Sequence, residues 1–289
     1  VANPDVTDAE AIEQIDIGGP TMVRAAAKNH AWVGIVTSPD RYEEVAAAVE
    51  AGGLDDELRR DLAREAFFHT AAYDAAIVGW LEGDDAARRV LALERHDELR
   101  YGENPHQPAA IYREVGRAGW WASARQLQGK AMSFNNHLDA EAAWRLVHDF
   151  GEPAAAIIKH ANPCGLAVAD SIAHAFSAAW DCDPLSAFGG IVALNRPLDA
   201  GTAARIAEAG FVEVVVAPEV ADVGPLAAKR NLRVLEAPVP DPDDPDLRRV
   251  DGGFVVQSRD RVESDGDWQV VSARRPTEAE WADLRFAWV

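Results

Sequence analysis

A lysine and a histidine stand side by side where an apolar segment gives way to a turn. Residues 154–158 are Ala-Ala-Ala-Ile-Ile, typical of a buried strand, and Lys159 and His160 follow directly. Pro163 restricts Asn162 to extended conformations and lacks an amide hydrogen, so we expect the strand to end near here. The ammonium and the imidazole can then project into one cleft at a strand's carboxyl end, where open α/β sheets bind ligands. Alone, the segment also fits a strand leaving the core through two solvated polar residues.

Three further segments gather polar residues and turn formers in ways that suit ligand binding. Residues 100–107 (RYGENPHQ) hold an arginine, a tyrosine and a histidine and are too polar for a core. Residues 183–190 (DPLSAFGG) lead into the apolar run 191–194, and their glycines let a ligand approach the backbone closely. Residues 15–21 (IDIGGPT) run into residues 22–30 as a predicted strand, glycine turn and helix, whose first amides suit an anion. Alone, each segment also fits a solvated loop, a β-turn or an ordinary βα connection.

The apolar periodicity predicts a mixed α/β protein. Residues 42–51 and 54–81 show the three-to-four spacing of helices. Beyond residue 100, short apolar strands alternate with helices, which is typical of a layered α/β fold. We expect strands near residues 31–37, 109–112, 154–158, 191–194, 212–217 and 286–289, and helices near residues 139–150, 171–180 and 202–209. The acidic, proline-rich residues 236–246 predict a surface loop, and the charged residues 84–97 a junction between domains.

The composition limits the class of function. The chain has 289 residues, a net charge of -20 and only two cysteines, Cys164 and Cys182. Two cysteines argue against a disulfide framework and a multi-cysteine metal site, and the acidity disfavours nonspecific nucleic-acid binding. No apolar run approaches the roughly 18 to 20 residues of a membrane span, so we expect a cytoplasmic protein with no membrane or nucleic-acid partner. A local group of Lys159, Arg100 and helix-start amides can still attract a phosphate.

Taken together, these segments resemble one family. The segments that carry the resemblance are residues 16–30 (DIGGPTMVRAAAKNH), 66–74 (AFFHTAAYD), 99–107 (LRYGENPHQ), 127–136 (LQGKAMSFNN), 159–165 (KHANPCG) and 183–190 (DPLSAFGG). In this order and spacing they are similar to the bifunctional purine-biosynthesis enzymes that join AICAR transformylase to IMP cyclohydrolase. The resemblance covers nearly the whole chain. Because full members extend further at both ends, we expect this chain to be an internal fragment.

The resemblance implies an architecture. Residues 93–289 would be the first part of the transformylase domain, with cytidine-deaminase-like α/β/α layers. Residues 1–92 would be the C-terminal part of the cyclohydrolase domain, which is methylglyoxal-synthase-like, together with its helical extension. The resemblance also implies a homodimer whose transformylase site is shared between subunits.

The resemblance implies a reaction as well. A formyl group would pass from 10-formyl-tetrahydrofolate to the exocyclic amine of AICAR, giving FAICAR, which the complete protein closes to IMP. His160 would be the general base, because an imidazole exchanges protons near neutral pH. Lys159 would stabilise the developing negative charge on the formyl oxygen. Folate enters as a substrate, and we expect no metal or nicotinamide cofactor.

The resemblance further implies binding residues for the nucleotide. Those for AICAR are Arg100, Tyr101, Asn135, Ser186, Phe188, Gly189 and Glu213. Asp16 and Lys28 match positions of the cyclohydrolase site, but most of that domain is absent, so we expect no cyclohydrolase activity from this chain. Phe188 also fits a core residue, and Glu213 a solvated strand end.

Two other functions are compatible with parts of the sequence. A noncatalytic fragment that binds the nucleotide is one of them, since residues on the folate side are missing. A zinc nucleoside deaminase is the other, because His96-Asp97-Glu98 and Pro163-Cys164 begin its two motifs. Ala167 stands where the last cysteine of that motif belongs, which leaves two ligands where a catalytic zinc site usually has three.

Overall fold

The computed structural model describes residues 6–83, 86–260 and 268–289, which divide between two units. The helical unit comprises residues 1–96 and 112–117, and the sheet unit comprises residues 97–111 and 118–289. Of the predicted junction, residues 84–85 lie outside the described residues. Within the described residues, no helix combines the length and the apolar character needed to cross a bilayer.

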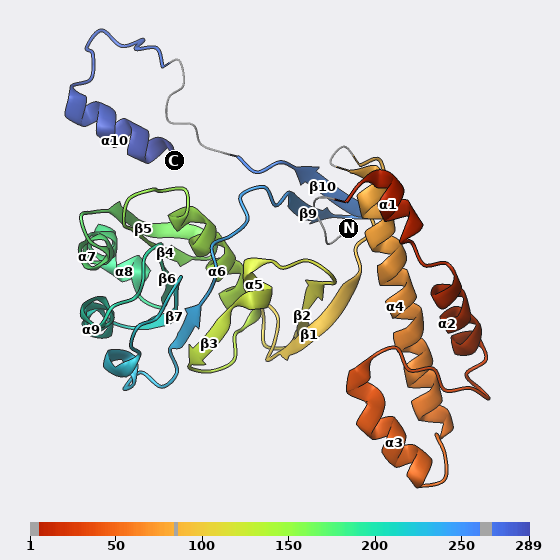
Figure 1. Ribbon diagram of the computed structural model, residues 1–289. Coiled ribbons are helices and arrows are strands. Elements are labelled where there is room, and N and C mark those ends of the chain that lie inside the picture. Colours follow the sequence, from red (N-terminus) through yellow and green to blue (C-terminus); the bar gives the residue numbers. More distant parts are fainter. Residues whose placement is uncertain (1–5, 84–85, 261–267) are drawn as a thin grey trace. The chain divides into compact units, whose positions relative to one another are not determined.

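The helical unit is built on one long helix. Its elements are α1 (Asp8–Glu13), α2 (Gly18–Lys28), η1 (Pro39–Arg41), α3 (Tyr42–Glu50) and α4 (Asp56–Glu82) (Figure 1). The Asp55 carboxylate begins α4 by accepting the Leu58 amide at 2.8 Å, and Gly83 ends it with a φ of 64°. Ala27 of α2 and Ala63 and Ala66 of α4 are buried together, so small side chains let the two helices approach closely.

The two helices expected within residues 42–81 are confirmed, but two expected strands are absent. Residues 31–37 are a turn followed by irregular backbone, and within the described residues they pair with no strand, since β1 (Leu93–Leu99) and β2 (Ala109–Glu114) pair only with each other. Residues 15–17 are also irregular, and α2 begins at Gly18, so both glycines lie in the first helical turn. Apolar character alone did not make these segments strands.

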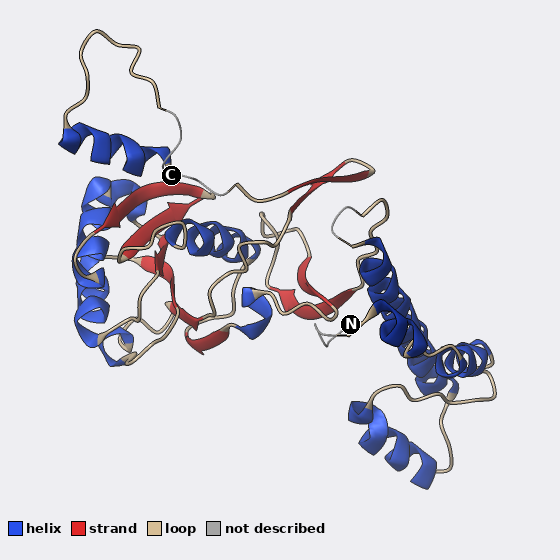
Figure 2. Cartoon of the chain, turned by 45° about the horizontal axis from the view of Figure 1, so that its top comes forward, coloured by secondary structure: helices blue, strands red, loops and turns tan. Residues whose placement is uncertain are grey.

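A six-stranded mixed sheet organises the sheet unit. Its elements are α5 (Trp120–Ser123), β3 (Arg125–Gln128), α6 (Phe134–Val147), β4 (Ala154–Lys159), β5 (Asn162–Val168), α7 (Ile172–Cys182), α8 (Pro184–Ala187), β6 (Gly190–Leu194), α9 (Ala200–Ala209), β7 (Val212–Ala217), η2 (Gly224–Leu226) and β8 (Arg233–Glu236). The strand order is β3-β8-β7-β6-β4-β5. Figure 2 draws the strands in red and the helices in blue. Strands β6, β7 and β8 are parallel, whereas β4 runs antiparallel to both of its neighbours. The α/β prediction is confirmed.

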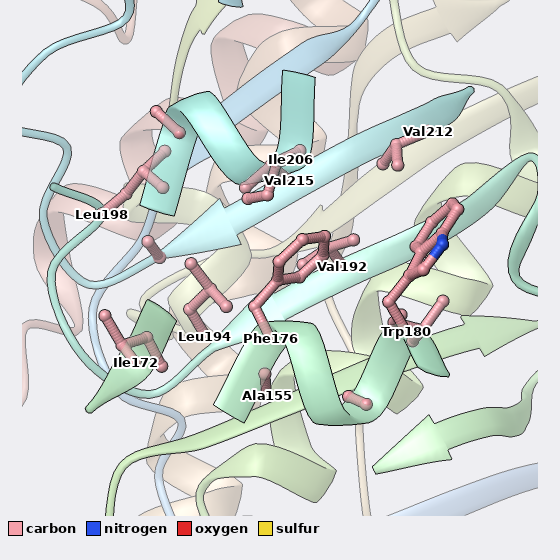
Figure 3. Close-up of a cluster of buried hydrophobic side chains, with 14 of the residues drawn as sticks. Ala155, Ile172, Phe176, Trp180, Val192, Leu194, Leu198, Ile206, Val212 and Val215 are labelled. Atoms are coloured by element: carbon pink, nitrogen blue, oxygen red, sulfur yellow. The ribbon is translucent and has the colours of Figure 1, made fainter. Parts of the chain in front are cut away.

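Two separate cores cover the faces of this sheet. One core packs α7 and α9 on the sheet through Phe176, Trp180 and Ile206, with Val192 and Val215 from the strands (Figure 3). The other packs α6 against the opposite face through Ala140, Trp144 and Val147. Strand β4 supplies both cores in alternation, as a strand buried on both faces must. It is therefore fixed from both sides.

Smaller elements complete the chain. Strands β1 (Leu93–Leu99) and β2 (Ala109–Glu114) pair with each other, as do β9 (Asp246–Val250) and β10 (Gly253–Gln257). The predicted surface loop at residues 236–246 is irregular except at its two ends, where β8 finishes and β9 begins.

The strand expected at residues 286–289 is wrong, because this segment belongs to α10 (Glu278–Trp288). Thr277 and Glu280 form a reciprocal capping box that begins the helix, so capping and helical spacing outweigh the apolar run. The ring of Phe286 lies 5.5 Å from that of Phe150.

Buried Asn195 joins the start of β4 to the end of α6. Its Oδ1 accepts the Ala154 amide at 2.7 Å, and its Nδ2 donates to the carbonyls of Val147, Phe150 and Glu152 at 2.8 to 3.0 Å. The two hydrogens of Nδ2 are shared among the three carbonyls. The side chain thus bonds backbone groups at the end of α6, in the connection after it and at the start of β4, and it sets where β4 enters the sheet.

We expect Asn195→Ala to lower the free energy of unfolding by about 2–4 kcal/mol, because buried backbone groups lose their partners. Urea unfolding followed by circular dichroism measures this, with Asn231→Ala at an exposed amide as the control. Equal unfolding midpoints for the two variants would contradict the role of Asn195.

Candidate functional site

The hairpin that follows β4 carries the lysine and histidine predicted to react. Strand β4 ends at Lys159, which pairs with Asn162 at the start of β5, so His160 and Ala161 form a two-residue turn. Their φ angles are 54° and 58°, the positive values at both central positions that define a type I′ turn. The strand ends beside Lys159 as predicted, but Pro163 is not the cause. Pro163 lies within β5, an edge strand, where proline is tolerated.

A carboxylate on α6 holds the backbone of this turn. The His160 amide donates to Oδ2 of Asp139 at 3.2 Å, and the Ala161 amide donates to Oδ1 at 2.7 Å. On the other side of the turn, Nδ2 of Asn162 donates to the His160 carbonyl at 2.8 Å. Both the amide and the carbonyl of His160 are therefore bonded, while its side chain is exposed.

Lys159 bonds to the loop that precedes β6. Its Nζ donates to the Phe188 carbonyl at 3.0 Å, which leaves two of its three ammonium hydrogens for other acceptors. Gly189 has a φ of 78°, and its amide donates to the Phe211 carbonyl at 2.8 Å, while the rings of Phe188 and Phe211 lie 5.5 Å apart. Residues 186–190, which run from the end of α8 to the first residue of β6 and are called the loop at residues 186–190 below, are thereby tied to the start of β7.

Ser186 is held by its own turn. Its amide and hydroxyl donate to the Asp183 carboxylate at 3.0 and 2.6 Å, and the hydroxyl bond is the larger cause that lowers the pKa of Asp183 below its usual range. Phe188 is 57% exposed, so it is not the core residue that the alternative interpretation allowed.

Glu213 lies in a polar cluster at the start of β7. Its Oε2 accepts Nδ2 of Asn136 at 2.8 Å and Nη1 of Arg233 at 3.3 Å. Arg233 also donates to the Ala131 carbonyl and is only 7% exposed. Glu213 is thus a bonded residue and not a solvated strand end, and the amide that contacts it comes from Asn136, next to the predicted Asn135.

Arg100 and Tyr101 contribute to the electrostatic environment of Arg233. Burial is the largest effect on the Arg233 guanidinium and lowers its pKa, and the positive charge of Arg100 lowers the pKa further. The Glu213 carboxylate and Tyr101 act in the opposite direction and raise it. The Arg100 guanidinium lies 5.5 Å from the centre of the Tyr101 ring. Both residues therefore lie within electrostatic reach of β8.

Strand register brings the Lys159–His160 turn, the loop at residues 186–190 and the Glu213 cluster to one edge of the sheet, meaning the side where strands begin and end. Ile158 pairs with Ile191, Gly190 with Val212 and Val214 with Arg233. The end of β4 and the starts of β6, β7 and β8 thus form a row of about 14 Å, three strand spacings long. Lys159 lies at the carboxyl end of β4, as expected. Because β4 is antiparallel to β6, the same edge also presents the amino ends of β6, β7 and β8.

Sequence reasoning missed four residues of this row: Asn136, Asp139, Phe211 and Arg233. Asn136 has a local signal, since it is the third residue after the cap Ser133 and forms a capping box with it. The contacts of Asp139 and Arg233 span 21 and 20 positions in the chain and depend on the sheet order.

The two residues predicted for a cyclohydrolase site lie at opposite ends of α2. Asp16 caps the start of the helix by accepting the Gly19 amide at 2.9 Å, and its own amide donates to the Tyr73 hydroxyl at 2.8 Å. Lys28 is the last residue of α2, about 15 Å further along the helix axis, and is exposed. The structure does not bring the two together, and the Asp16 carboxylate already occupies one of the amides expected to bind an anion.

A cavity of about 530 Å³ lies apart from the predicted residues. It is lined by Arg145, His148, Asp149, Val239, Pro240, Asp241, Pro242, Asp246, Arg248, Gln257, Arg259 and Asp260. Burial lowers the pKa of His148 and raises that of Asp149. Arg145 pairs with the Asp244 carboxylate, Arg248 pairs with the Asp246 carboxylate, and Arg259 donates to the Asp244 carbonyl. The positive charges that line this cavity are therefore largely bonded within the protein.

Across residues 6–83, 86–260 and 268–289, no three His, Cys, Asp or Glu side chains come together as metal ligands. Cys164, the one cysteine of the deaminase-like motif, is half-buried. Burial is the largest effect on its thiol and raises the pKa, and the negative charges of Asp183 and Asp139 raise it further. The positive charge of Lys159 lowers the pKa. The reactivity of the Cys164 thiol should therefore depend on the charge of Lys159.

Comparisons with known proteins agree over nearly the whole chain. A family model described as AICARFT/IMPCHase bienzyme matches residues 26–289. The bifunctional purine biosynthesis protein PurH of Cutibacterium acnes is 48% identical over 292 residues, covering 96% of this chain and 56% of the relative. Those of Synechococcus elongatus and Acidithiobacillus ferrooxidans are each 48% identical over 300 and 309 residues, covering 100% of this chain and 58% of the relative. The chain spans a little over half the length of these relatives.

We expect Cys164 to react with iodoacetamide more slowly than Cys182, because the thiolate is the reactive form and burial disfavours it. Lys159→Met should slow Cys164 by a further two- to fivefold or so, since a nearby positive charge is lost. Mass spectrometry of the alkylated peptides at several pH values measures both rates. Lys130→Met, at an exposed lysine, is the control, and faster alkylation in Lys159→Met would contradict the assigned charge environment.

Proposed function

The chain belongs to the AICARFT/IMPCHase bienzyme family, and on that premise we propose that its sheet unit binds AICAR for formyl transfer from 10-formyl-tetrahydrofolate. In a protein with the full length of the relatives, FAICAR would then close to IMP. For the 289 residues alone, we propose nucleotide binding without turnover, in the cytoplasm.

One observation carries the proposal. The Lys159–His160 turn, the loop at residues 186–190 and the Glu213 cluster come from distant parts of the chain, yet strand register sets them in one row. A row of about 14 Å is long enough for a nucleotide's phosphate, ribose and base. It supplies one imidazole, two cations and a carboxylate from His160, Lys159, Arg233 and Glu213.

The reaction needs a base and an electrostatic partner. The exocyclic amine of AICAR is a poor nucleophile, because its lone pair delocalises into the ring. As its nitrogen attacks the formyl carbon, the His160 imidazole takes the proton. The formyl oxygen gains negative charge, and the free hydrogens of the Lys159 ammonium stabilise it. The tetrahedral intermediate then collapses as the bond between the formyl carbon and the folate nitrogen breaks, and the leaving nitrogen takes the proton that the His160 imidazolium returns.

The remaining residues would recognise the nucleotide. Arg100 would bind the phosphate through two parallel bonds that a lysine could not reproduce, with Tyr101 beside it. Phe188 and Gly189 would lie against the base, with Ser186 and Asn135 as polar neighbours. Glu213 is already oriented by Asn136 and Arg233, so it would present its second oxygen to the ribose or the base.

The finer architecture is also part of the proposal. We propose cytidine-deaminase-like layers for residues 93–289 and a methylglyoxal-synthase-like remnant for residues 1–92. The separation of Asp16 and Lys28 along α2 supports the expectation that this chain alone has no cyclohydrolase activity.

The catalytic assignment is tested in a hybrid of the Cutibacterium acnes relative, in which this chain replaces the matching segment. His160→Ala should lower the rate of formyl transfer by about 10²- to 10⁴-fold with little change in AICAR binding, because a general base acts in the transition state. His174→Ala, at an exposed histidine of α7, should retain full activity. Equal activity in the two variants would refute the role of His160.

Sharing of the site between subunits has its own test. We propose that Arg100 and Tyr101 of one subunit act on the nucleotide held by Lys159 and His160 of the other. Hybrids carrying Arg100→Ala and His160→Ala should then regain activity when mixed, up to about a quarter of the wild-type value, since random exchange gives half heterodimers with one intact site each. If subunits exchange and the mixture stays inactive, Arg100 serves its own chain.

A further inference from the structure

We propose that Asp139 is a positioning residue for formyl transfer, holding the His160–Ala161 turn in the strained shape that presents the imidazole. The inference rests on the function proposed above. Asp139 has no role in the sequence interpretation, and its carboxylate accepts both central amides of the turn.

The backbone of this turn is costly. His160 and Ala161 are the only residues other than glycine with positive φ in the described part of the chain. The left-handed region costs an L-residue about 1–2 kcal/mol, which explains why such turns usually contain Asn-Gly. A hairpin selected only for stability would place glycine or asparagine here. The chain instead keeps a histidine at the first central position, and something must offset the strain.

Asp139 is suited to that task. Its two carboxylate oxygens take one amide each, at 3.2 Å from His160 and 2.7 Å from Ala161, and bonds to a charged acceptor are stronger than neutral ones. Two successive amides that point at one anion form the concave backbone arrangement that binds anions elsewhere, and here the anion is part of the chain.

The helix that carries Asp139 is rigidly placed. Ala140, Ala143 and Trp144 of α6 are fully buried against the sheet, and Ser133 caps its start. Asn136, three positions before Asp139 and so on the same side of the helix, bonds to Glu213. One turn of α6 therefore holds both ends of the proposed site, the base at one end and the carboxylate at the other.

The imidazole is left free by this arrangement. The amide and carbonyl of His160 are satisfied by Asp139 and Asn162, and within the described residues its ring makes no hydrogen bond. The backbone is thus fixed while the ring nitrogens stay available for a substrate. A base held in this way needs no reorganisation when the substrate binds.

The test uses the 289-residue chain and three variants. Asp139→Asn keeps the shape but replaces one acceptor oxygen by an amide donor that opposes the turn. Asp139→Asn/Ala161→Gly adds a residue that adopts positive φ without strain. Asp222→Asn removes a carboxylate that also accepts a turn amide, from Gly224 at 2.7 Å, in a turn without predicted site residues. Nuclear magnetic resonance follows the amide exchange and the φ-dependent couplings of residues 160 and 161, and the His160 ring signals during titration with AICAR.

In Asp139→Asn, we expect amide protection at residues 160 and 161 to fall roughly 10- to 100-fold, the loss that follows removal of a bond to a charged group. The response of the His160 ring to AICAR should fall with it. Ala161→Gly in the same chain should restore the positive-φ couplings and much of the ring response. Asp222→Asn should match the wild type at both residues.

Two results would overturn the positioning role. One is a turn that keeps its protection and couplings in Asp139→Asn. The other is a turn that changes while the His160 ring responds to AICAR as in the wild type. A wild-type ring that does not respond to AICAR would instead refute the proposed function, and the turn measurements would still show whether Asp139 holds the hairpin.

Discussion

The burial of β4 on both faces is the constraint on which the candidate site depends. Ala155 and Ile157 pack into one core, Ala156 and Ile158 into the other, and Asn195 fixes where the strand begins. A strand held in this way cannot slide, because a shift by one residue would exchange its two faces. The position of its last residue, Lys159, at the sheet edge is therefore fixed.

Antiparallel pairing decides what that edge contains. If β4 were parallel to β6, its end would meet the ends of the other strands. Because it runs the other way, Lys159 lies beside the turn before β6 and in line with the starts of β7 and β8. Gly190 permits this close approach of β4, since a β-carbon there would lie 3.1 Å from the Ile158 carbonyl oxygen. The row of polar groups follows from one reversal of strand direction.

The sequence predicted the parts of the fold that have local signals. The run at residues 154–158, the periodicity of α4 and the alternation after residue 100 all became the expected elements. Residues 31–37 and 286–289 did not become strands. A short apolar run forms a strand only if a partner strand is present, and the run at residues 286–289 instead lies at the end of a helix that Thr277 caps. The sequence also identified Lys159, His160, Phe188 and Glu213 as chemically interesting. It could not identify Asp139 or Arg233, because their contacts exist only after α6 and β8 have taken their places in the sheet.

The central claim is that the Lys159–His160 turn, the loop at residues 186–190 and the Glu213–Arg233 cluster form one nucleotide site. Hydrogen exchange of the 289-residue chain, measured by mass spectrometry with and without AICAR, tests this most directly. We predict that AICAR slows exchange together in peptides that contain residues 159–161, 186–190, 211–213 and 231–233, with little change elsewhere in the sheet unit. Slowing confined to the cavity lined by Arg145, Arg248 and Arg259, with none along the sheet edge, would contradict it.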